Sequence, residues 1–250
     1  MNRDHIIRTT QIRNHFNKAA KTYDKNCFIQ QLIGTELITC LKNFKPRAKN
    51  ILDLGCGTGL LTEILALTYH DFQQFYAIDI AEKFLAIAMD RLSKYSINIQ
   101  EKSFENFDCN RISFDLIFSN MALHWSENVE LMLSHIYTSL SPDGILAFSI
   151  PTYGTFKELN KKNILPLSKT QEIRLKLKQC GFIILNASER VSCLTYPSFI
   201  FALKSIKEVG ANYCDKQKTP TNLLRFRKLL GQSFSLTYKI AIFIAARKKV

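Results

Sequence analysis

The chain has 250 residues, 46% of them hydrophobic and 22% charged, a composition that provides a hydrophobic core and excludes an intrinsically disordered protein. Its net charge of +13 favours an acidic partner such as nucleic acid, an anionic membrane or an acidic protein, although a lysine-rich proteome would produce the same balance. We expect a cytoplasmic protein without signal peptide or membrane span, because the N-terminus is charged and no apolar run approaches roughly 20 residues.

An apolar stripe near the N-terminus predicts a helix over residues 24–43. Its members recur at the spacing of one helix face and are Phe28, Ile29, Leu32, Ile33, Leu37, Ile38 and Leu41. Pro46 ends this helix, and basic residues follow in a short connection. We interpret residues 1–48 as an N-terminal helical cap.

From Asn50 onward, short apolar runs alternate with helical stretches. The predicted strands are 51–54, 75–78, 97–100, 114–119 and 145–150, and the predicted helices are 60–69, 81–94 and 129–140. The sequence Pro142-Asp143-Gly144 predicts a turn just before the last of these strands. Strands and helices that alternate with short links build a parallel sheet, so residues 49–196 are interpreted as a Rossmann-like core.

After Pro151, strands and helices no longer alternate regularly. Helices are predicted at 156–163, 169–180, 199–209 and 222–230, one long or two short strands at 182–196, and a final strand at 236–246. We interpret residues 197–231 as a helical lid inserted before the last strand, and residues 232–250 as that final strand of the core.

A glycine-rich motif lies where the first strand turns into a helix. Gly55, Gly57 and Gly59 alternate there, and glycine permits both a tight turn and close approach of the backbone to a ligand. Dinucleotide-binding folds space their glycines as G-x-G-x-x-G. Here the spacing is G-x-G-x-G, and Asp53 precedes it by two positions. A carboxylate would repel phosphate but suits the ammonium and sulfonium of S-adenosylmethionine, which we predict as the cofactor.

Asp79 ends the second predicted strand. A carboxylate at this place can accept hydrogen bonds from both hydroxyls of a ribose. The alternative is a cap for the helix that follows, and one aspartate can serve in both ways. No arginine lies within several residues of Asp79, which disfavours a 2′-phosphate and therefore NADP.

The cysteines and histidines predict no metal site. Seven cysteines are scattered along the chain, none two or three residues from another, and five histidines form no H-x-x-x-H pair. We therefore interpret the cysteines as reduced, small hydrophobic residues of the core.

Several segments resemble known methyltransferases. Residues 48–152 resemble the class I methyltransferases in the strand, glycine motif and acidic residue described above. More specific features resemble the malonyl-acyl-carrier-protein O-methyltransferases of biotin synthesis, and the likeness runs nearly end to end. These features are Phe16-Asn17-Lys18-Ala19-Ala20, Tyr23-Asp24, Gln30, Ser119-Asn120-Met121-Ala122-Leu123-His124-Trp125, Phe148-Ser149-Ile150-Pro151-Thr152, Gly154-Thr155-Phe156, Glu158-Leu159, Leu203-Lys204-Ser205-Ile206-Lys207, Gly210-Ala211 and Leu236-Thr237-Tyr238. The family often has Lys-Gly in the lid helix, whereas this chain has Lys207-Glu208.

The resemblance implies an α/β fold of the Rossmann-like class I methyltransferase type. Such a fold has a mostly parallel, doubly wound sheet, with an N-terminal helical cap and a helical lid insertion before the last strand. The implied reaction moves a methyl group from S-adenosylmethionine to the free carboxylate of a malonyl thioester. The thioester is carried by an acidic acyl-carrier protein, and the malonyl methyl ester primes pimeloyl chain synthesis for biotin. Neither a membrane nor a nucleic acid is expected as a partner.

The implied chemistry needs no general base, because a malonyl carboxylate is already ionised at neutral pH. The site has to align carboxylate oxygen, methyl carbon and sulfur, and to keep water away. It also needs a cation, ideally a forked arginine, to hold the malonyl carboxylate.

The resemblance also implies which side chains form the site. Those expected at the cofactor are Tyr23, Asp53, Gly55, Gly57, Gly59, Asp79, Ile80, Phe104, Glu105 and Asn120. Those expected to position the substrate are Tyr23, His124, Lys207 and Arg225, with Lys204 and Arg227 as further lid cations. The alternatives are a core tyrosine, a structural histidine and solvated surface charges.

Other functions remain open at this point. A class I methyltransferase of this kind could act on another carboxylate, on a small metabolite or on tRNA. The chain lacks an N-P-P-Y-like motif and a catalytic cysteine in the expected loop, which disfavours tRNA. A catalytically silent binding module is disfavoured by the intact glycine motif and Asp79. Neither the oligomeric state nor a preference for the carrier protein over coenzyme A is predicted.

Overall fold

A seven-stranded sheet organises the chain, in the order β3-β2-β1-β4-β5-β7-β6. The structure is a computed structural model and describes residues 3–107, 112–159, 164–213 and 232–248. The strands are β1 (Asn50–Leu54), β2 (Gln74–Asp79), β3 (Ile97–Glu101), β4 (Phe114–Asn120), β5 (Leu140–Pro151), β6 (Phe182–Tyr196) and β7 (Phe234–Arg247). Strands β1 to β5 run parallel, and β7 runs antiparallel to both β5 and β6. The prediction of a mostly parallel, doubly wound sheet is confirmed.

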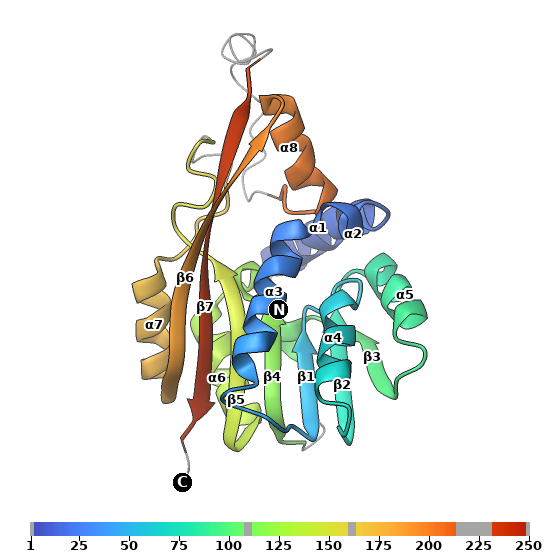
Figure 1. The fold of residues 1–250 in the computed structure, drawn as a ribbon, viewed down its shortest axis with the longest axis vertical. Helices are drawn as coiled ribbons and strands as arrows, with labels where there is room; N and C mark the ends of the chain where they lie inside the picture. The colour runs from blue at the N-terminus through green and yellow to red at the C-terminus, as the bar shows by residue number, and fades with distance from the viewer. Residues whose placement is uncertain (1–2, 108–111, 160–163, 214–231, 249–250) are drawn as a thin grey trace.

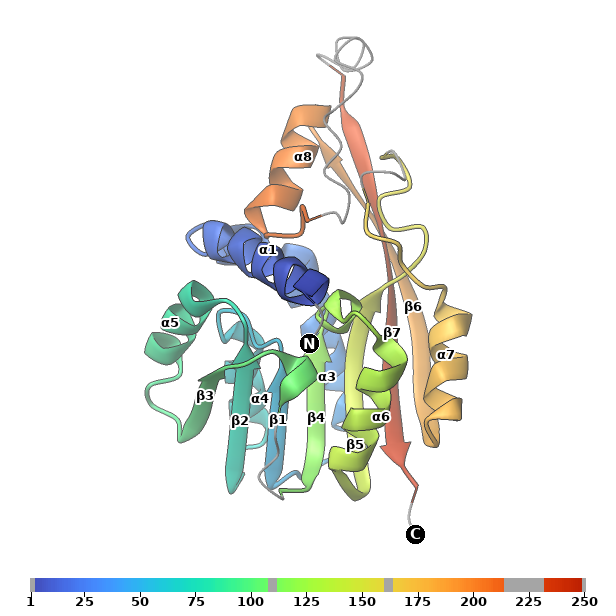
Figure 2. The ribbon, with the colours of Figure 1, turned by 180° about the vertical axis from the view of Figure 1, so that it is seen from behind.

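Helices cover both faces of this sheet. They are α1 (Arg3–Ala19), α2 (Tyr23–Asn26), α3 (Phe28–Leu41), α4 (Leu60–Thr68), α5 (Glu82–Arg91), α6 (Val129–Ser139), α7 (Thr170–Gln179) and α8 (Phe199–Glu208), with short 3-10 turns η1 (Phe104–Asn106) and η2 (Leu123–Trp125). Helices α3 and α4 lie on one face, and α6 and α7 on the other (Figures 1 and 2). Helix α1 crosses the carboxyl ends of the parallel strands.

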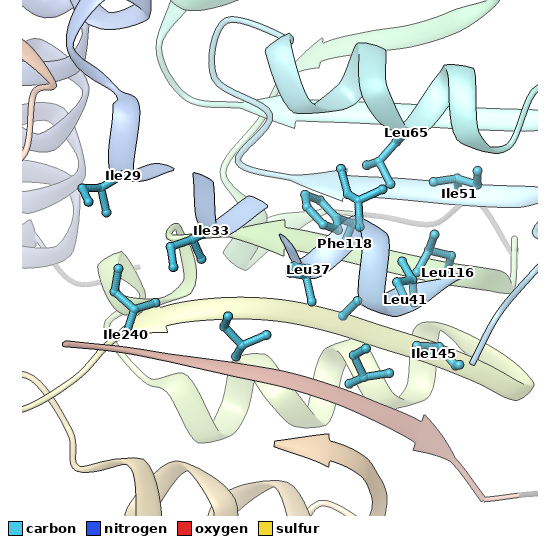
Figure 3. Packing of buried hydrophobic residues seen from close by; sticks show 14 of the residues in the cluster. Ile29, Ile33, Leu37, Leu41, Ile51, Leu65, Leu116, Phe118, Ile145 and Ile240 are labelled. Atoms are coloured by element: carbon cyan, nitrogen blue, oxygen red, sulfur yellow. The ribbon is translucent and has the colours of Figure 1, made fainter. Parts of the chain in front are cut away.

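The core explains why the first strands are short apolar runs. Ile51 to Leu54 are all buried, because helices cover both sides of β1. Figure 3 shows Ile33 and Leu37 of α3 packed near Phe118 of β4. The predicted helix over 24–43 is broken at Cys27 into α2 and α3. Its predicted apolar face was too broad, since Phe28 is 60% and Leu32 47% exposed.

Tertiary hydrogen bonds overturn one predicted helix. Residues 156–159 of the predicted helix 156–163 form turns, and Phe156 has a φ of +55°. The N–H of Phe156 donates to the carbonyl of Thr237 at 2.6 Å, and Glu158 accepts from the N–H of Thr237 at 3.0 Å. These bonds to β7 replace the bonds that a helix would make within itself.

Two other predictions are refined. Pro142-Asp143-Gly144 lies within β5 rather than before it, as an irregularity where Asp143 takes a φ of +60°. Residues 182–196 form one continuous strand, because β6 pairs with β7 along its whole length. The other strands and helices predicted within the described residues are confirmed to within a few residues.

Strands β6 and β7 extend well beyond the parallel strands, and α8 lies beside their extension (Figures 1 and 2). The predicted helix at 222–230 lies outside the described residues, and the boundaries 1–48, 49–196, 197–231 and 232–250 stay predictions. No helix in the described part of the chain is both long and apolar enough to span a bilayer.

Candidate active site

The glycine turn between β1 and α4 has the backbone that only glycine adopts readily. Gly55, Gly57 and Gly59 have φ values of +79°, +57° and +79°. A Cβ on Gly59 would lie 3.1 Å from the Cβ of Ala88, so this glycine lets α5 pack against the turn. A Cβ on Gly57 would meet only the ring of Phe84, at 3.7 Å. Gly57 is therefore the position where a ligand can approach the backbone.

Asp79 holds the turn and the next helix together. One carboxylate oxygen accepts from the N–H of Gly57 and the other from the N–H of Ala81, both at 2.9 Å. Burial raises the pKa of Asp79, while these backbone hydrogen bonds oppose the rise. A carboxylate offers about four lone-pair sites, so two remain for a ligand.

Asp53 lies deeper and is 2% exposed. Its carboxylate accepts a hydrogen bond of 2.7 Å from the hydroxyl of Thr62 in α4. Burial raises the pKa of Asp53 to about 7, the hydroxyl of Thr62 lowers it and the charge of Asp79 raises it further. This carboxylate lacks a cationic partner among the described residues, and a cationic ligand would supply one.

Two adjoining cavities open over these residues. The first, about 690 Å³ with the open solvent at its mouth included, is lined by Thr9, Ile12, Phe16, Tyr23, Gly55, Gly57, Asp79, Ile80, Phe84, Ser103, Phe104, Glu105, Asn120, Met121, Ala122 and Trp125. The second, about 400 Å³ by the same measure, is lined by Tyr23, Cys27, Gln30, Gln31, Asp53, Gly55, Cys56, Gly57, Thr58, Leu60, Leu61, Phe118 and Asn120. Both cavities combine apolar side chains with a few polar groups, which is typical of a small-molecule site.

Tyr23 and Asn120 stand where the two cavities meet, because both line each of them. The ring of Tyr23 packs at 4.7 Å from the ring of Phe84, and burial raises the pKa of its phenol, which keeps the hydroxyl protonated. Asn120 donates to the carbonyl of Gln30 at 3.0 Å and accepts from the hydroxyl of Ser149 at 2.7 Å. These bonds fix the orientation of the Asn120 amide.

Ile80, Phe104 and Glu105, which we predict as cofactor residues, line the first cavity. Glu105 accepts from the hydroxyl of Ser126 at 3.0 Å and from the N–H of Glu127 at 2.7 Å. The structure therefore gathers the predicted cofactor residues around the two cavities, with Gly59 behind the turn rather than on a cavity wall.

The described residues that we predict to position the substrate do not line the two cavities, except for Tyr23. His124 lines neither cavity, and its ring lies 4.7 Å from that of Trp125. Burial, with the charge of Arg8, lowers the pKa of His124 to about 3, so the ring is neutral at physiological pH. Lys207 and Lys204 are exposed on α8, outside both cavities.

Lys204 lies 3.6 Å from the carboxylate of Glu208, which is a contact within α8. Arg225 and Arg227 lie outside the described residues. In the described part of the chain, no lysine or arginine lines either cavity.

Sequence reasoning missed the contribution of α1. Thr9, Ile12 and Phe16 line the first cavity, and their spacing of three and four residues is that of one helix face, a signal that could have identified them. Among the described residues, no group of three or more His, Cys, Asp or Glu side chains could hold a metal ion.

Comparisons with known proteins agree on a methyltransferase. Residues 52–148 match the family described as "Methyltransferase domain". A malonyl-[acyl-carrier protein] O-methyltransferase 2 from Coxiella burnetii is 35% identical over 95% of this chain and 96% of its own. A malonyl-[acyl-carrier protein] O-methyltransferase from Bacillus cereus is 29% identical over 98% of this chain and 99% of its own.

Solved structures share the fold. A crystal structure of a methyltransferase from Bacillus halodurans superposes with a TM-score of 0.64 at 15% identity, covering 85% of this chain and 97% of its own. An N-methyltransferase from Bradyrhizobium japonicum, solved in complex with S-adenosyl-L-homocysteine, gives a TM-score of 0.56 at 14% identity, with 86% and 85% covered.

Proposed function

The chain belongs to the malonyl-[acyl-carrier protein] O-methyltransferase family, and on this premise we propose that it methylates the free carboxylate of a malonyl group on an acyl-carrier protein. It is an S-adenosylmethionine-dependent methyltransferase, and its product, the malonyl methyl ester, primes pimeloyl chain synthesis for biotin. The observation that carries this proposal is that the glycine turn and Asp79 line one cavity in a chain that matches such an enzyme over 95% of its length.

The two cavities suit the two halves of the cofactor. Asp79 has free lone pairs for the ribose hydroxyls, and Gly57 leaves room for the ligand at the backbone. Ile80, Phe104 and Glu105 would hold the adenine in the first cavity. The S-adenosylmethionine supplies the methyl group from its sulfonium.

The second cavity would hold the amino-acid half of the cofactor. Asp53, when ionised, would pair with the ammonium, which would supply the cation that this buried carboxylate lacks among the described residues. The hydroxyl of Tyr23 contacts the methionine carboxylate. Asn120, at the junction of the cavities, lies beside the reacting methyl group.

The residues around the junction act by positioning. A malonyl carboxylate is ionised at neutral pH, so no proton has to be removed from it. The largely apolar lining from Phe16, Met121 and Trp125 excludes water, which favours attack of an anion on a sulfonium. His124, which is neutral, serves as a hydrogen-bonding group and not as a cation.

The cation for the malonyl carboxylate comes from the lid, residues 197–231. We name Arg225 and Lys207 first, followed by Arg227 and Lys204, which are the lid cations that the resemblance to the family implies. The acyl-carrier protein that we propose as partner is acidic and meets the chain in the cytoplasm, without a membrane or nucleic acid.

Complementation tests this function. A bacterial strain that cannot start pimeloyl chain synthesis should grow without biotin when it expresses this chain, and should not grow with an empty vector. The purified protein should transfer labelled methyl groups from S-adenosylmethionine to malonyl-acyl-carrier protein and not to tRNA. A folded, expressed protein that does neither would overturn the proposal.

A further inference from the structure

Three side chains from separate elements form a closed ring beside the glycine turn. The hydroxyl of Thr58 donates to one carboxylate oxygen of Asp24 at 2.6 Å. Arg91 donates to the other oxygen of Asp24 at 2.6 Å, and through its second nitrogen to the hydroxyl of Thr58 at 3.1 Å. The same nitrogen of Arg91 also donates to the carbonyl of Thr58.

This ring joins segments that are far apart in the sequence. Asp24 belongs to α2 of the cap, Thr58 to the turn itself, and Arg91 to the last turn of α5. Thr58 is 1% exposed, and the side chains of Asp24 and Arg91 are 31% and 21% exposed. One guanidinium nitrogen of Arg91 bonds the carboxylate and the other bonds Thr58, and a charge-assisted hydrogen bond to a partly buried carboxylate is stronger than an exposed ion pair.

The ring lies outside the cofactor cavities. Asp24 and Arg91 line neither of them, and Thr58 reaches only the second. The residue before Asp24, however, is Tyr23, which lines both cavities and packs on Phe84 of α5. Any movement of α2 away from the turn therefore withdraws Tyr23 from the cavities and breaks the ring.

We propose that Asp24 and Arg91 are positioning residues that latch α2 onto the glycine turn, and so control how fast the cofactor and its product exchange. The latch rests on the proposed binding of S-adenosylmethionine between α2 and the turn. It keeps Tyr23 over the junction of the cavities during methyl transfer, and it has to open before S-adenosylhomocysteine leaves. Neither Asp24 nor Arg91 touches the reacting atoms.

The latch predicts a kinetic change that a general loss of stability would not produce. In Asp24→Asn, S-adenosylhomocysteine should dissociate on the order of tenfold faster, as expected for a lost charge-assisted contact. Stopped-flow fluorescence can follow this step, because Trp125 is the single tryptophan of the chain and lines the first cavity. Asp24→Glu, which keeps the carboxylate, should restore most of the slow dissociation.

A matched control uses an ion pair away from the cavities. Lys49 and Asp71 lie 2.8 Å apart, and neither lines a cavity, so Asp71→Asn should leave the dissociation rate unchanged. Arg91→Gln and the double variant with Asp24→Asn should each resemble Asp24→Asn, because removing either partner opens the same ring. If one single variant folds poorly, the other still tests the latch, because each alone opens the same ring.

The outcomes separate the latch from the function on which it rests. If the wild-type chain binds S-adenosylhomocysteine and the folded Asp24→Asn and Arg91→Gln variants release it at the wild-type rate, the latch is wrong and the function stands. If the rates of the two variants rise but multiply in the double variant, the two residues act separately and the latch is wrong. Failure of the wild-type chain to bind overturns the proposed function and the latch together.

Discussion

Asp53 and Asp79 end up in the same site with different hydrogen-bond partners. Asp79 accepts two backbone N–H groups, whereas Asp53 accepts a single hydroxyl from Thr62. Burial raises the pKa of both carboxyls, and it raises that of Asp53 to about 7. Asp79 is therefore equipped for neutral donors such as ribose hydroxyls, and Asp53 for a cation that restores its charge.

Asp79→Asn should weaken S-adenosylmethionine binding by about 1.5–3 kcal/mol, because a charge-assisted contact to the ribose is lost. The asparagine still offers one oxygen to the backbone, so the glycine turn should survive. Isothermal calorimetry measures the affinity, and Asp90→Asn, at an exposed position on α5, is the control. Unchanged affinity in a folded Asp79→Asn variant would remove Asp79 from the site.

Affinity for S-adenosylmethionine should fall as the pH drops below about 7, since Asp53 is protonated there and the ammonium binds its ionised form. Well below this pKa, each further pH unit should weaken binding by about tenfold, relative to Asp53→Asn measured in the same buffers. Asp53→Asn should bind more weakly near pH 8 and lack this dependence. Parallel pH profiles for both proteins would contradict the assignment.

The free energy of unfolding of the unliganded protein should depend on pH in the opposite direction, because of the same residue, Asp53. Its folded pKa of about 7 lies above the ordinary value of 3.8, so the folded state holds the proton more tightly than the unfolded chain. The stability that this proton contributes is fully present below about pH 3.8 and is lost as the pH rises through about 7. Urea unfolding of Asp53→Asn should show a flatter pH dependence over that range than the wild-type chain.

At the scale of elements, β7 joins the loop after β5 to the sheet and contacts α8. The loop after β5 is fastened to this strand, because the hydroxyl of Thr155 donates to the carbonyl of Lys239 at 2.8 Å and accepts from its N–H at 3.0 Å. Helix α8 is tied to the cap as well, since the hydroxyl of Thr22 donates to the carbonyl of Glu208 at 2.9 Å. Helix α8 is therefore held by contacts with β6 and β7 on one side and with α1 and α2 on the other.

A lid cation should make the site prefer the malonyl substrate over its own product. Methylation neutralises the carboxylate and leaves the cation unpaired, a penalty of a few kcal/mol, so the methyl ester and acetyl carriers should bind much more weakly. Arg225→Met or Lys207→Met should erase this preference and leave S-adenosylmethionine affinity nearly intact. Competition assays with malonyl, methyl-ester and acetyl carriers measure it.

Lys178→Met, at an exposed position in α7, is the matched control for the lid variants and should keep the wild-type preference. Full discrimination in both lid variants would mean that the carboxylate is held elsewhere. Arg227, Lys204 and His124 would then be the next positions to replace.

At the scale of the whole molecule, the chain has a large positive net charge. The 34 lysines and arginines exceed the 21 aspartates and glutamates, which leaves the net charge of +13. A field of this sign attracts an acidic partner before contact and speeds its association, but it is screened by salt over about 10 Å at 0.1 M.

Methyl transfer to malonyl-acyl-carrier protein should therefore slow steeply between low and physiological salt. A small malonyl thioester has little charge to be steered, so its rate should change far less. Steady-state kcat/KM for the two substrates over a salt series makes the comparison. Equal salt dependence would show that the positive charge has another purpose.

The sequence alone determined the order in which strands and helices of the core follow one another along the chain. It also determined the position of the glycine turn. Short apolar runs mark strands buried on both faces, and a backbone with positive φ calls for glycine, so both signals are local. The glycine motif with Asp53, and the position of Asp79 at the end of the next strand, also predicted a site for one nucleoside cofactor.

Only the tertiary structure decided what depends on contacts between distant segments. It turned Phe28 and Leu32 outward on α3, and it replaced the predicted helix at residues 156–159 by bonds to β7. It also brought Asp24 to Thr58 and Arg91, across 34 and 67 residues of sequence. Hydrophobic periodicity predicts that one face of a helix is buried, but it does not predict which element covers that face. The polar partners of a side chain are set only when the elements have packed together.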